Sequence, residues 1–492
     1  MKKLFLVFSL IAFAVGIVGC TADPTETEAE TTIEATTTEE ATTTEEATTT
    51  EEATTTEEAT TTEEATTTEA TTTEETTTAE QVVSQGVTDT EILVGNTAAV
   101  TGAFAGVGVP FNDAIKAVFE QVNEDGGIGG REINFISYND EFDATKGVTF
   151  TETLVEQDEV FALVGHFGTP TVGATLDYIQ NQGVPMVYAA TGINGLYFEE
   201  SVGNPVMAVQ PIYLTDGRIM AARALTHPVY GATGDAEFPT DGRIGVLYTN
   251  DDVGNSIKTG VETELDVLGI SEENVTYISA SLDTMASAVT DASFENLDVV
   301  ILAMNQQPFA AALTEMANQN VNVPVFTSYV NADPTYVDPL QYNEDRPIFT
   351  NAWVDVFSEE GQAAVADYAA IIMAADFLDE ETKTAYMTNS FAIAGYIAAV
   401  VFIEGLERVE ANGEVLNWDN YIAAMEEGAI DIPMGGSVDF SGGKRWGIAS
   451  MALLEYYVGD NPATEDVVET DFETFNQVVS IETIEEIEAK FE

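Results

Sequence analysis

The sequence predicts an α/β protein of two or more globular units with mostly parallel sheets, preceded by a disordered tether. From Glu91 onward, short apolar runs rich in β-branched residues alternate with segments of helical spacing. This alternation is typical of parallel strands joined by right-handed helical crossovers. The chain has 492 residues, more than one hydrophobic core usually holds. Residues 21–80 consist mainly of Thr, Glu and Ala, a composition that offers almost nothing to a core.

The first twenty residues indicate an exported protein. Two lysines precede an apolar run from Leu4 to Val18, which is short for a membrane span but typical of a signal peptide, here residues 1–19. Cys20, the only cysteine, stands where bacterial lipoproteins, which this segment resembles, carry the cysteine that is lipidated after cleavage. An ordinary signal that ends at a cysteine is the alternative. We expect an extracytoplasmic protein held at the membrane by a lipid on Cys20, without internal disulfides.

A short repeat follows Cys20. The hexapeptide EATTTE recurs, with an alanine at every sixth position from Ala35 to Ala65. Because its carboxylates repel one another and little apolar surface is available, we expect residues 20–80 to form a disordered linker. As a flexible coil, roughly sixty residues span about 45 Å, so the linker would hold the globular part away from the membrane.

The net charge of −70 limits the choice of partners. Only 19 of the 85 acidic residues lie in residues 21–80, so the globular part is strongly acidic as well. Such a surface repels the phosphates of nucleic acids and of anionic lipids. We therefore expect no nucleic acid and no anionic membrane surface as a partner.

The first globular unit begins near residue 88 with two pairs of a strand and a helix. A loop rich in small residues, which carries Thr101 and Phe104, follows the first strand. Glycines after Asp125 predict the end of the first helix, because glycine readily adopts the left-handed conformation that stops a helix. In order we expect a strand at 91–96, a helix around 115–122, a strand at 133–138 and a helix at 145–156.

The stretch from Leu163 to Gly192 is the centre of the functional prediction. An apolar strand at 160–164 is followed by Thr169 and a proline at the start of a segment with helical spacing. Threonine suits the N-cap and proline the first turn, and the free N–H groups there can receive a carboxylate. A second strand at 184–190 ends in Thr191, so both strand ends would open onto one crevice, where open α/β sheets bind ligands. The alternative is that Thr169 only caps the helix.

A second α/β unit follows the segment from Gln210 to Tyr213. The same criteria of spacing and turn residues apply to it. The expected elements are strands at 244–248, 275–280, 299–303 and 323–329, helices at 362–377 and 390–408, a hairpin over 436–457 that turns at 441–443, and an amphipathic helix at 481–491.

Five segments in order carry a resemblance to a known family: TGAFAGVGVPFNDAIKAVFEQVNEDGGIGGREI, GHFGTPTVGATLDYIQNQGVPMVYAATG, QPIYLTDGR, RIGVLYTNDDVG and AGYIAAVVFIEGLERV. Together they resemble the solute-binding proteins of branched-chain amino acid ABC importers. The resemblance implies the type I periplasmic-binding fold, in which two α/β lobes with mostly parallel sheets are joined by three crossover strands. It places residues 88–212 and 331–430 in lobe 1 and residues 213–330 and 431–460 in lobe 2, and leaves 461–492 as an acidic C-terminal segment.

The resemblance also implies which residues bind a solute between the lobes. The expected contacts are Thr101, Phe104, Gly168, Thr169, Ala190, Thr191, Gly192, Tyr213, Asn305, Gln306 and Tyr329. A solute carboxylate would lie on the N–H groups and hydroxyls around Thr169, and Tyr213 would lie on a crossover strand. The alternative for Phe104 and Tyr329 is that they are ordinary core residues. The alternative for Asn305 and Gln306 is that they form a solvated strand end.

Two positions depart from the amino-acid binders of this family. Such proteins typically place an acidic residue near the strand end at Tyr329 to meet the α-ammonium, and residues 327–330 contain none. They also tend to have an aromatic residue where Val253 stands. A carboxylate or amide solute is therefore as well supported as an amino acid.

The sequence lacks motifs for catalysis and for cofactors. Neither a nucleophile elbow nor a Walker loop occurs,. The glycines at 126–130 do not link a strand to a following helix, and residues 139–143 lack the spacing of an EF-hand. His166 and His227 are the only histidines, too few for a zinc site beside a single cysteine. We expect no enzymatic activity, no cofactor and no metal.

These observations predict a lipid-anchored, extracytoplasmic substrate-binding component of an ABC importer. It would act as a monomer, capture a small polar solute (an amino acid, amide or carboxylate) and pass it to permease and ATPase subunits. A ligand sensor on the same fold, feeding a receptor or kinase, is one alternative. The Thr/Glu linker taken alone would also fit a surface adhesin.

Overall fold

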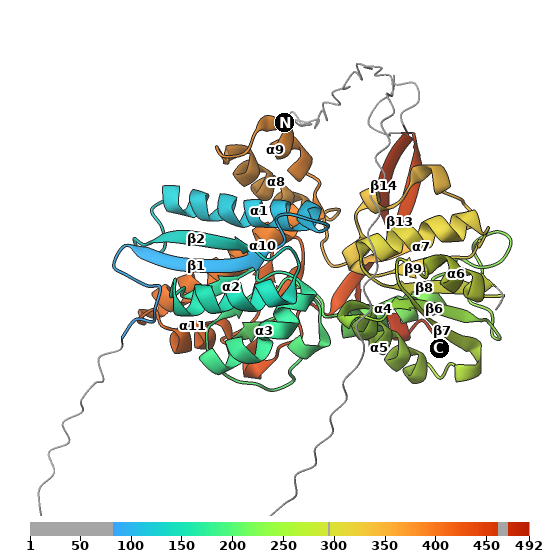
Figure 1. Ribbon diagram of the computed structural model, residues 1–492, viewed down its shortest axis with the longest axis horizontal. Coiled ribbons are helices and arrows are strands. Elements are labelled where there is room, and N and C mark those ends of the chain that lie inside the picture. Colours follow the sequence, from blue (N-terminus) through green and yellow to red (C-terminus); the bar gives the residue numbers. More distant parts are fainter. Residues whose placement is uncertain (1–81, 294–295, 461–470, 492) are drawn as a thin grey trace, which may run out of the picture. The chain divides into compact units, whose positions relative to one another are not determined.

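Figure 1 shows the computed structural model, which describes residues 82–293, 296–460 and 471–491. The signal peptide, Cys20 and the linker lie outside these residues, so what the sequence indicates about them stays a prediction. The described chain forms two large sheets, both mostly parallel and covered by helices. The α/β prediction is confirmed.

The first sheet has five parallel strands in the order β2-β1-β3-β4-β5. Their bounds are β1 Glu91–Ala98, β2 Glu132–Asn139, β3 Ala162–Val164, β4 Met186–Val187 and β5 Val206–Met207. Along β1, Ile92 and Val94 join a core that contains Ile115, whereas Leu93 packs against a second cluster that contains Val172. This alternation of side chains requires helices on both faces of the sheet.

The helices of the first sheet come from two parts of the chain. They are α1 Ala105–Glu124, α2 Ala144–Glu156 and α3 Thr169–Gln182, and later α8 Glu359–Ala374, α9 Glu380–Tyr386, α10 Ser390–Asn412 and α11 Trp418–Met425. α10 lies against α1 so closely that a Cβ on Gly395 would be 2.0 Å from the carbonyl oxygen of Phe111. In the described part of the chain, α10 is the one helix long and apolar enough to cross a membrane. Its burial against α1 accounts for that composition.

The second sheet has seven strands in the order β14-β13-β10-β9-β8-β6-β7. Their bounds are β6 Ile244–Thr249, β7 Val275–Ala280, β8 Val299–Ala303, β9 Val325–Thr327, β10 Ile348–Ala352, β13 Ser450–Asp460 and β14 Asp471–Thr483. The strands from β6 to β10 run parallel, and β13 and β14 are antiparallel to their neighbours. The sheet therefore ends in a long antiparallel pair.

The helices of the second sheet also lie on both of its faces. They are α4 Tyr213–Thr226, α5 Asp252–Val267, α6 Met285–Ser293, α7 Gln306–Asn318 and α12 Ile484–Glu488. α4 and α5 meet at their backbones: a Cβ on Gly217 would lie 2.2 Å from the carbonyl oxygen of Ile257, and one on Gly260 would lie 2.2 Å from that of Leu214. Only two facing glycines permit this approach. The contact fixes α4, whose first residue is Tyr213.

The chain passes between the two sheets three times. The first connecting segment joins β5 to α4, and the second joins β10 to α8. The third joins β12 (Gly436–Val438), which pairs with β11 (Ile430–Ile432), to β13. The first and third segments touch, because the Ile448 N–H donates to the Val209 carbonyl oxygen at 2.9 Å. A Cβ on Gly447 would lie 2.2 Å from the carbonyl oxygen of Gln210, so the two segments are in backbone contact.

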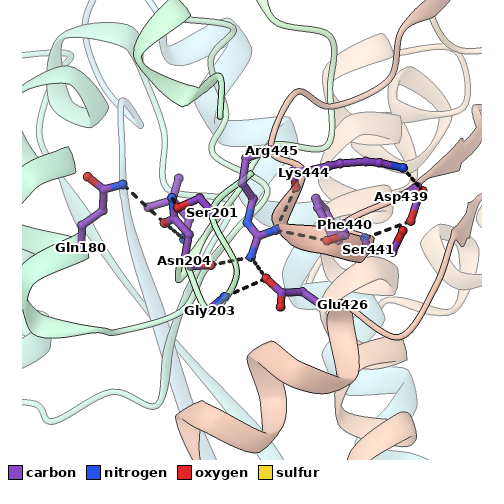
Figure 2. A network of polar contacts seen from close by, with 11 residues as sticks. Gln180, Ser201, Gly203, Asn204, Glu426, Asp439, Phe440, Ser441, Lys444 and Arg445 are labelled. Carbon is purple, nitrogen blue, oxygen red and sulfur yellow. Dashed lines mark hydrogen bonds and ion pairs between the residues drawn. The ribbon is translucent and has the colours of Figure 1, made fainter. Parts of the chain in front are cut away.

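Arg445 holds the third connecting segment in place, as Figure 2 shows. Its side chain is fully buried, and one guanidinium nitrogen donates to the carbonyl oxygens of Lys444 at 2.8 Å and Phe440 at 3.4 Å. The other donates to the carbonyl oxygen of Asn204 at 2.7 Å and pairs with Glu426, the C-cap residue of α11, at 2.5 Å. Arg445 thus joins this segment to the loop before β5 and to α11.

Two expected elements near the C-terminus are wrong. The hairpin over 436–457 with a turn at 441–443 does not form, because β12 pairs with β11 while β13 pairs with β10 and β14. The helix expected over 481–491 is shorter, since β14 continues to Thr483 and α12 covers only 484–488.

The assignment of elements to lobes differs at β10 and at β12. Residues 348–352 fall in the range 331–430 expected in lobe 1, yet they form β10, which pairs with β9 and β13 in the second sheet. Parallel pairing with β9 continues the strand and helix alternation of the second unit. Residues 436–438, expected in lobe 2, form β12, which pairs with β11 and precedes the third connecting segment. The other lobe boundaries stay a prediction.

Candidate ligand-binding site

A cavity of about 840 Å³ is lined by helix starts from both sheets and by the connecting segments. Eight residues that the sequence nominates line it: Phe104, Gly168, Thr169, Ala190, Tyr213, Asn305, Gln306 and Tyr329. The other three, Thr101, Thr191 and Gly192, do not line it. Its volume falls within the range of small-molecule sites, about 300 to 1,000 Å³.

The sequence predicts Thr169 as the N-cap of α3, and this prediction is wrong, because Thr169 is the first residue of the helix. The N-cap is Gly168, whose φ of 97° suits glycine,, and a Cβ placed there would lie 2.9 Å from the ring of Phe142. The hydroxyls of Thr169 and Thr191 lie 2.7 Å apart. Burial raises the pKa of Tyr213, and hydrogen bonds with these two threonines oppose that shift. Thr191 therefore positions the hydroxyl of Thr169 from behind the cavity wall.

Tyr213 and Tyr329 bring the second unit to the same wall. Tyr213 starts α4 and does not lie on a crossover strand, and its ring centroid is 6.2 Å from that of Tyr329. The phenol of Tyr329 donates to the Pro211 carbonyl oxygen at 2.8 Å and accepts from the Gln210 amide at 2.9 Å. The first connecting segment thus fixes the orientation of Tyr329, and Gln210 lines the cavity beside it.

Tyr188 lines the cavity although no sequence pattern indicated it. Its backbone has a φ of 56°, which is uncommon for a bulky residue. Its side chain is fully buried, between the rings of Phe111 at 5.8 Å and Trp353 at 6.4 Å. Its phenol oxygen has no hydrogen-bond partner among the described residues. A strained backbone and an unpaired buried hydroxyl on a cavity wall point to a ligand contact.

The start of α7 contributes two amide side chains to the cavity. Asn305 is the N-cap residue, but its side chain makes no capping hydrogen bond. Gln306 donates from its amide nitrogen to the Val330 carbonyl oxygen at 3.0 Å. Its amide oxygen, like the phenol oxygen of Tyr188, is buried without a partner in the described part of the chain. The amide oxygen is thus left to accept from a solute.

Most of the remaining cavity wall is apolar. Phe104 stacks on Phe142 with ring centroids 3.9 Å apart, and Phe111 packs against Phe167 at 5.8 Å. None of the described residues that line the cavity is Lys or Arg, and Asp333 is the one with a charged side chain. A solute in this cavity would contact mainly aromatic and aliphatic groups, together with a smaller number of polar side chains.

Asp333 brings an acidic side chain to the cavity that Tyr329 lines, although residues 327–330 contain none. It follows the stretch 327–330 by a few residues and lines the same cavity. One carboxylate oxygen accepts from the backbone N–H of Thr335 at 2.9 Å and from its hydroxyl at 2.7 Å. The other departure carries less weight than the sequence suggests, because Val253 is buried in α5 and does not line the cavity.

Asp216 and His166 are fully buried and do not line the cavity. Asp216, in the first turn of α4, accepts from the Asn351 amide at 2.8 Å, and burial raises its pKa to about 6. His166 has its Nε2 atom 3.2 Å from the hydroxyl of Thr151 and 3.3 Å from that of Thr175. Burial lowers the pKa of His166 to about 3, so this histidine is a neutral core residue.

Comparison with known proteins agrees with this architecture. Residues 91–460 match the family described as periplasmic binding protein. The chain belongs to this family. Among curated relatives of this periplasmic binding protein is the Leu/Ile/Val-binding protein homolog 2 of Brucella abortus (strain 2308), 21% identical over 243 residues, which are 49% of this chain and 61% of the relative. The chain thus spans less than two thirds of that relative.

Solved structures show the same fold. A fatty acid ABC transporter substrate-binding protein from Thermomonospora curvata is 20% identical with a TM-score of 0.62, and the match covers 80% of this periplasmic binding protein and 95% of that chain. A branched chain amino acid ABC transporter from Thermus thermophilus with bound valine is 14% identical with a TM-score of 0.62, over 81% and 97% of the two chains. Similarity at these levels of sequence identity supports the fold alone. The solute therefore has to be inferred from the residues of the site.

Proposed function

We propose that this periplasmic binding protein is the extracytoplasmic substrate-binding component of an ABC importer, and that its solute has one polar end and an apolar body. The descriptions of the relatives support the importer role, since they name binding proteins for branched-chain amino acids and for fatty acids. The sequence predicts a small polar solute. The apolar cavity wall extends that prediction to a solute with a sizeable apolar part.

The observation that carries the proposal is the pairing of an apolar cavity with unpaired polar atoms at its wall. The phenol of Tyr188 can donate a hydrogen bond, and the amide oxygen of Gln306 can accept one; both are buried and without partners among the described residues. Thr169 adds a hydroxyl held by Thr191. Because unpaired buried polar groups are costly, a solute that pairs with them gains both affinity and a fixed orientation.

The polar end of the solute is an amide, a carboxylate or an amino acid group. No Lys or Arg lies among the described lining residues, so a carboxylate would depend on hydroxyls and on the N–H groups at the start of α3. A carboxamide matches the donor on Tyr188 and the acceptor on Gln306. Asp333 is the residue that would meet an α-ammonium group, which keeps apolar amino acids among the candidates.

The location and partners belong to the same proposal. We place the mature chain outside the cytoplasm, attached through a lipid on Cys20, with the linker 20–80 as a spacer. The solute would be passed to permease and ATPase subunits made from other genes. Metabolic labelling with a fatty-acid analogue checks the anchor: the wild type should incorporate the label, and Cys20→Ser should not. Label in both proteins would contradict lipidation at Cys20.

A thermal-shift screen tests the solute. The panel contains apolar and polar amino acids, primary amides, aromatic acids and straight-chain acids. A solute at one hundred times its Kd stabilises the folded state by about 2.7 kcal/mol, which raises the melting temperature by several degrees. We expect shifts from solutes with an apolar body and none from glutamate or other strongly polar compounds. Shifts from polar compounds alone would contradict the apolar body, and no shift at all would contradict the substrate-binding role.

A further inference from the structure

The C-terminal segment, residues 471–491, lies beyond residues 91–460 that match the family. It begins with β14, which pairs with β13 along most of its length; Phe475 lies opposite Tyr456, and Gln477 opposite Leu454. β14 is the outer strand of the second sheet (Figure 1). The sequence predicts an acidic end with a helix at 481–491 and no strand here, so β14 is a feature that the fold reveals.

Buried side chains and ion pairs hold the segment against α4. Ile484 and Ile487 of α12 are buried. Arg218 of α4 pairs with Glu488 at 3.0 Å, and Arg223 pairs with Glu482 at 3.0 Å. The chain has only 15 Lys and Arg residues, and two of them on one helix serve this contact. The C-terminal segment is therefore an integral part of the second unit, attached to the helix that begins at Tyr213.

The same segment reaches the ligand cavity. Thr474 and Phe475 of β14 line the cavity, together with Leu454 of β13. Phe475 is buried, and its ring meets that of Tyr456 edge-on at 5.5 Å. Tyr456 in turn packs against Tyr342 at 5.9 Å. Phe475 is thus held rigidly by neighbours that belong to the second sheet and its loops, while part of its surface faces the cavity.

We propose that β14 determines which solutes fit, with Phe475 and Thr474 forming the part of the wall that limits the size of the apolar body. This inference rests on the proposed function, since it concerns the same cavity. A pocket wall built from a rigid aromatic ring excludes larger solutes by steric contact and favours those that just reach it. One methylene group at such a wall changes affinity by about tenfold or more.

Three variants of the full mature chain test the proposal. Phe475→Ala enlarges the cavity at β14, and Thr474→Trp fills it. Val478→Ala is the matched control, because Val478 lies on the same strand but is 40% exposed and does not line the cavity. The probes are homologous series of straight-chain monocarboxylates, their primary amides and apolar amino acids of increasing side-chain size. Calorimetry measures the Kd of each probe with each protein.

We expect Phe475→Ala to shift the preference toward larger members of the series that the wild type binds, by about tenfold in relative affinity. Thr474→Trp should shift it toward smaller members, and Val478→Ala should leave the ranking unchanged. If Phe475→Ala unfolds, Thr474→Trp still decides, because it adds a side chain at a half-buried position and removes no packing. An unchanged ranking in the folded cavity variants overturns the role of β14. A wild type that binds no probe, in contrast, overturns the proposed function itself.

Discussion

The hydroxyls of Thr169 and Thr191 lie 2.7 Å apart, but only Thr169 lines the cavity. The two residues follow different strands of the first sheet, so the hydrogen bond joins two strand ends at the site. Mutation of the two threonines can therefore separate the loss of this hydrogen bond from the loss of a contact with the solute. Removing either hydroxyl breaks the same hydrogen bond, whereas only one removal takes a polar group from the cavity wall.

Thr169→Val should weaken solute binding about tenfold, since a hydrogen bond in a buried site contributes about 1 to 1.5 kcal/mol. Thr191→Val should weaken it less, although both variants should lose a similar amount of stability. Calorimetric titration with the solute found in the screen gives the two affinities, and thermal melting without solute gives the stabilities. Equal losses of affinity in the two variants would show that the Thr169 hydroxyl acts only through its hydrogen bond with Thr191 and does not contact the solute.

Tyr188→Phe should have opposite effects on the free and the bound protein. Removing an unpaired buried hydroxyl relieves a desolvation penalty, so the free protein should gain about 1 kcal/mol of stability. The solute should lose a hydrogen bond and bind about fivefold or more weakly. Melting curves with and without solute report both effects. A variant that is less stable without solute, with unchanged affinity, would mean that Tyr188 is an ordinary core aromatic.

Asp216→Asn should change how stability depends on pH. Burial raises the pKa of Asp216 from 3.8 to about 6, so the folded state takes up a proton more readily than the unfolded state. The charged carboxylate therefore destabilises the fold increasingly as pH rises from about 4 to about 6, and by a constant amount above that.

The stability gained by Asp216→Asn should follow that profile, reaching about 2 to 3 kcal/mol near neutral pH and vanishing near pH 4. Denaturant unfolding across this pH range measures it. His166 is present in both proteins, so its titration cancels in the difference. A difference that does not vary with pH would contradict a buried carboxylate with a raised pKa.

Arg445→Met should lower the free energy of unfolding by about 3 to 5 kcal/mol, because it removes the guanidinium from the mostly buried Glu426 and from three backbone carbonyl oxygens,. The neighbouring Lys444→Met is the control, since the Lys444 and Asp439 side chains are 36% and 37% exposed and such pairs contribute less than about 1 kcal/mol. Denaturant unfolding of both variants gives the comparison. Similar small losses would show that Arg445 does not hold the third connecting segment.

The strands and helices with a strong apolar pattern could be predicted from the sequence. α8 and α10 begin within a few residues of their expected positions, because their spacing and their Ser and Asn caps are local signals. The hairpin predicted over residues 436–457, which contain β12 and most of β13, is wrong for a different reason. Both runs have strand character, but pairing partners are chosen by tertiary packing, and β13 joins β10 and β14 instead of turning back on β12.

The parts of the site that escaped prediction are those that depend on neighbours far along the chain. Tyr188 lies in an apolar run that suggests core, and only the fold shows its unpaired oxygen at a cavity. Asp333 was passed over because it lies beyond the strand end. β14 carries acidic and exposed residues, as an edge strand facing water does, so its sequence resembles a solvated tail.

The backbone contact between α4 and α5 has a consequence for any survey of random substitutions. A methyl group on Gly217 or Gly260 would be forced against a carbonyl oxygen at 2.2 Å, and relief would require α4 to move away from α5. Because α4 begins at Tyr213, solute binding should weaken in these variants, as we expect when a cavity residue is replaced. A tolerance map of this chain would thus mark two glycines as strongly as the site, although neither touches a solute.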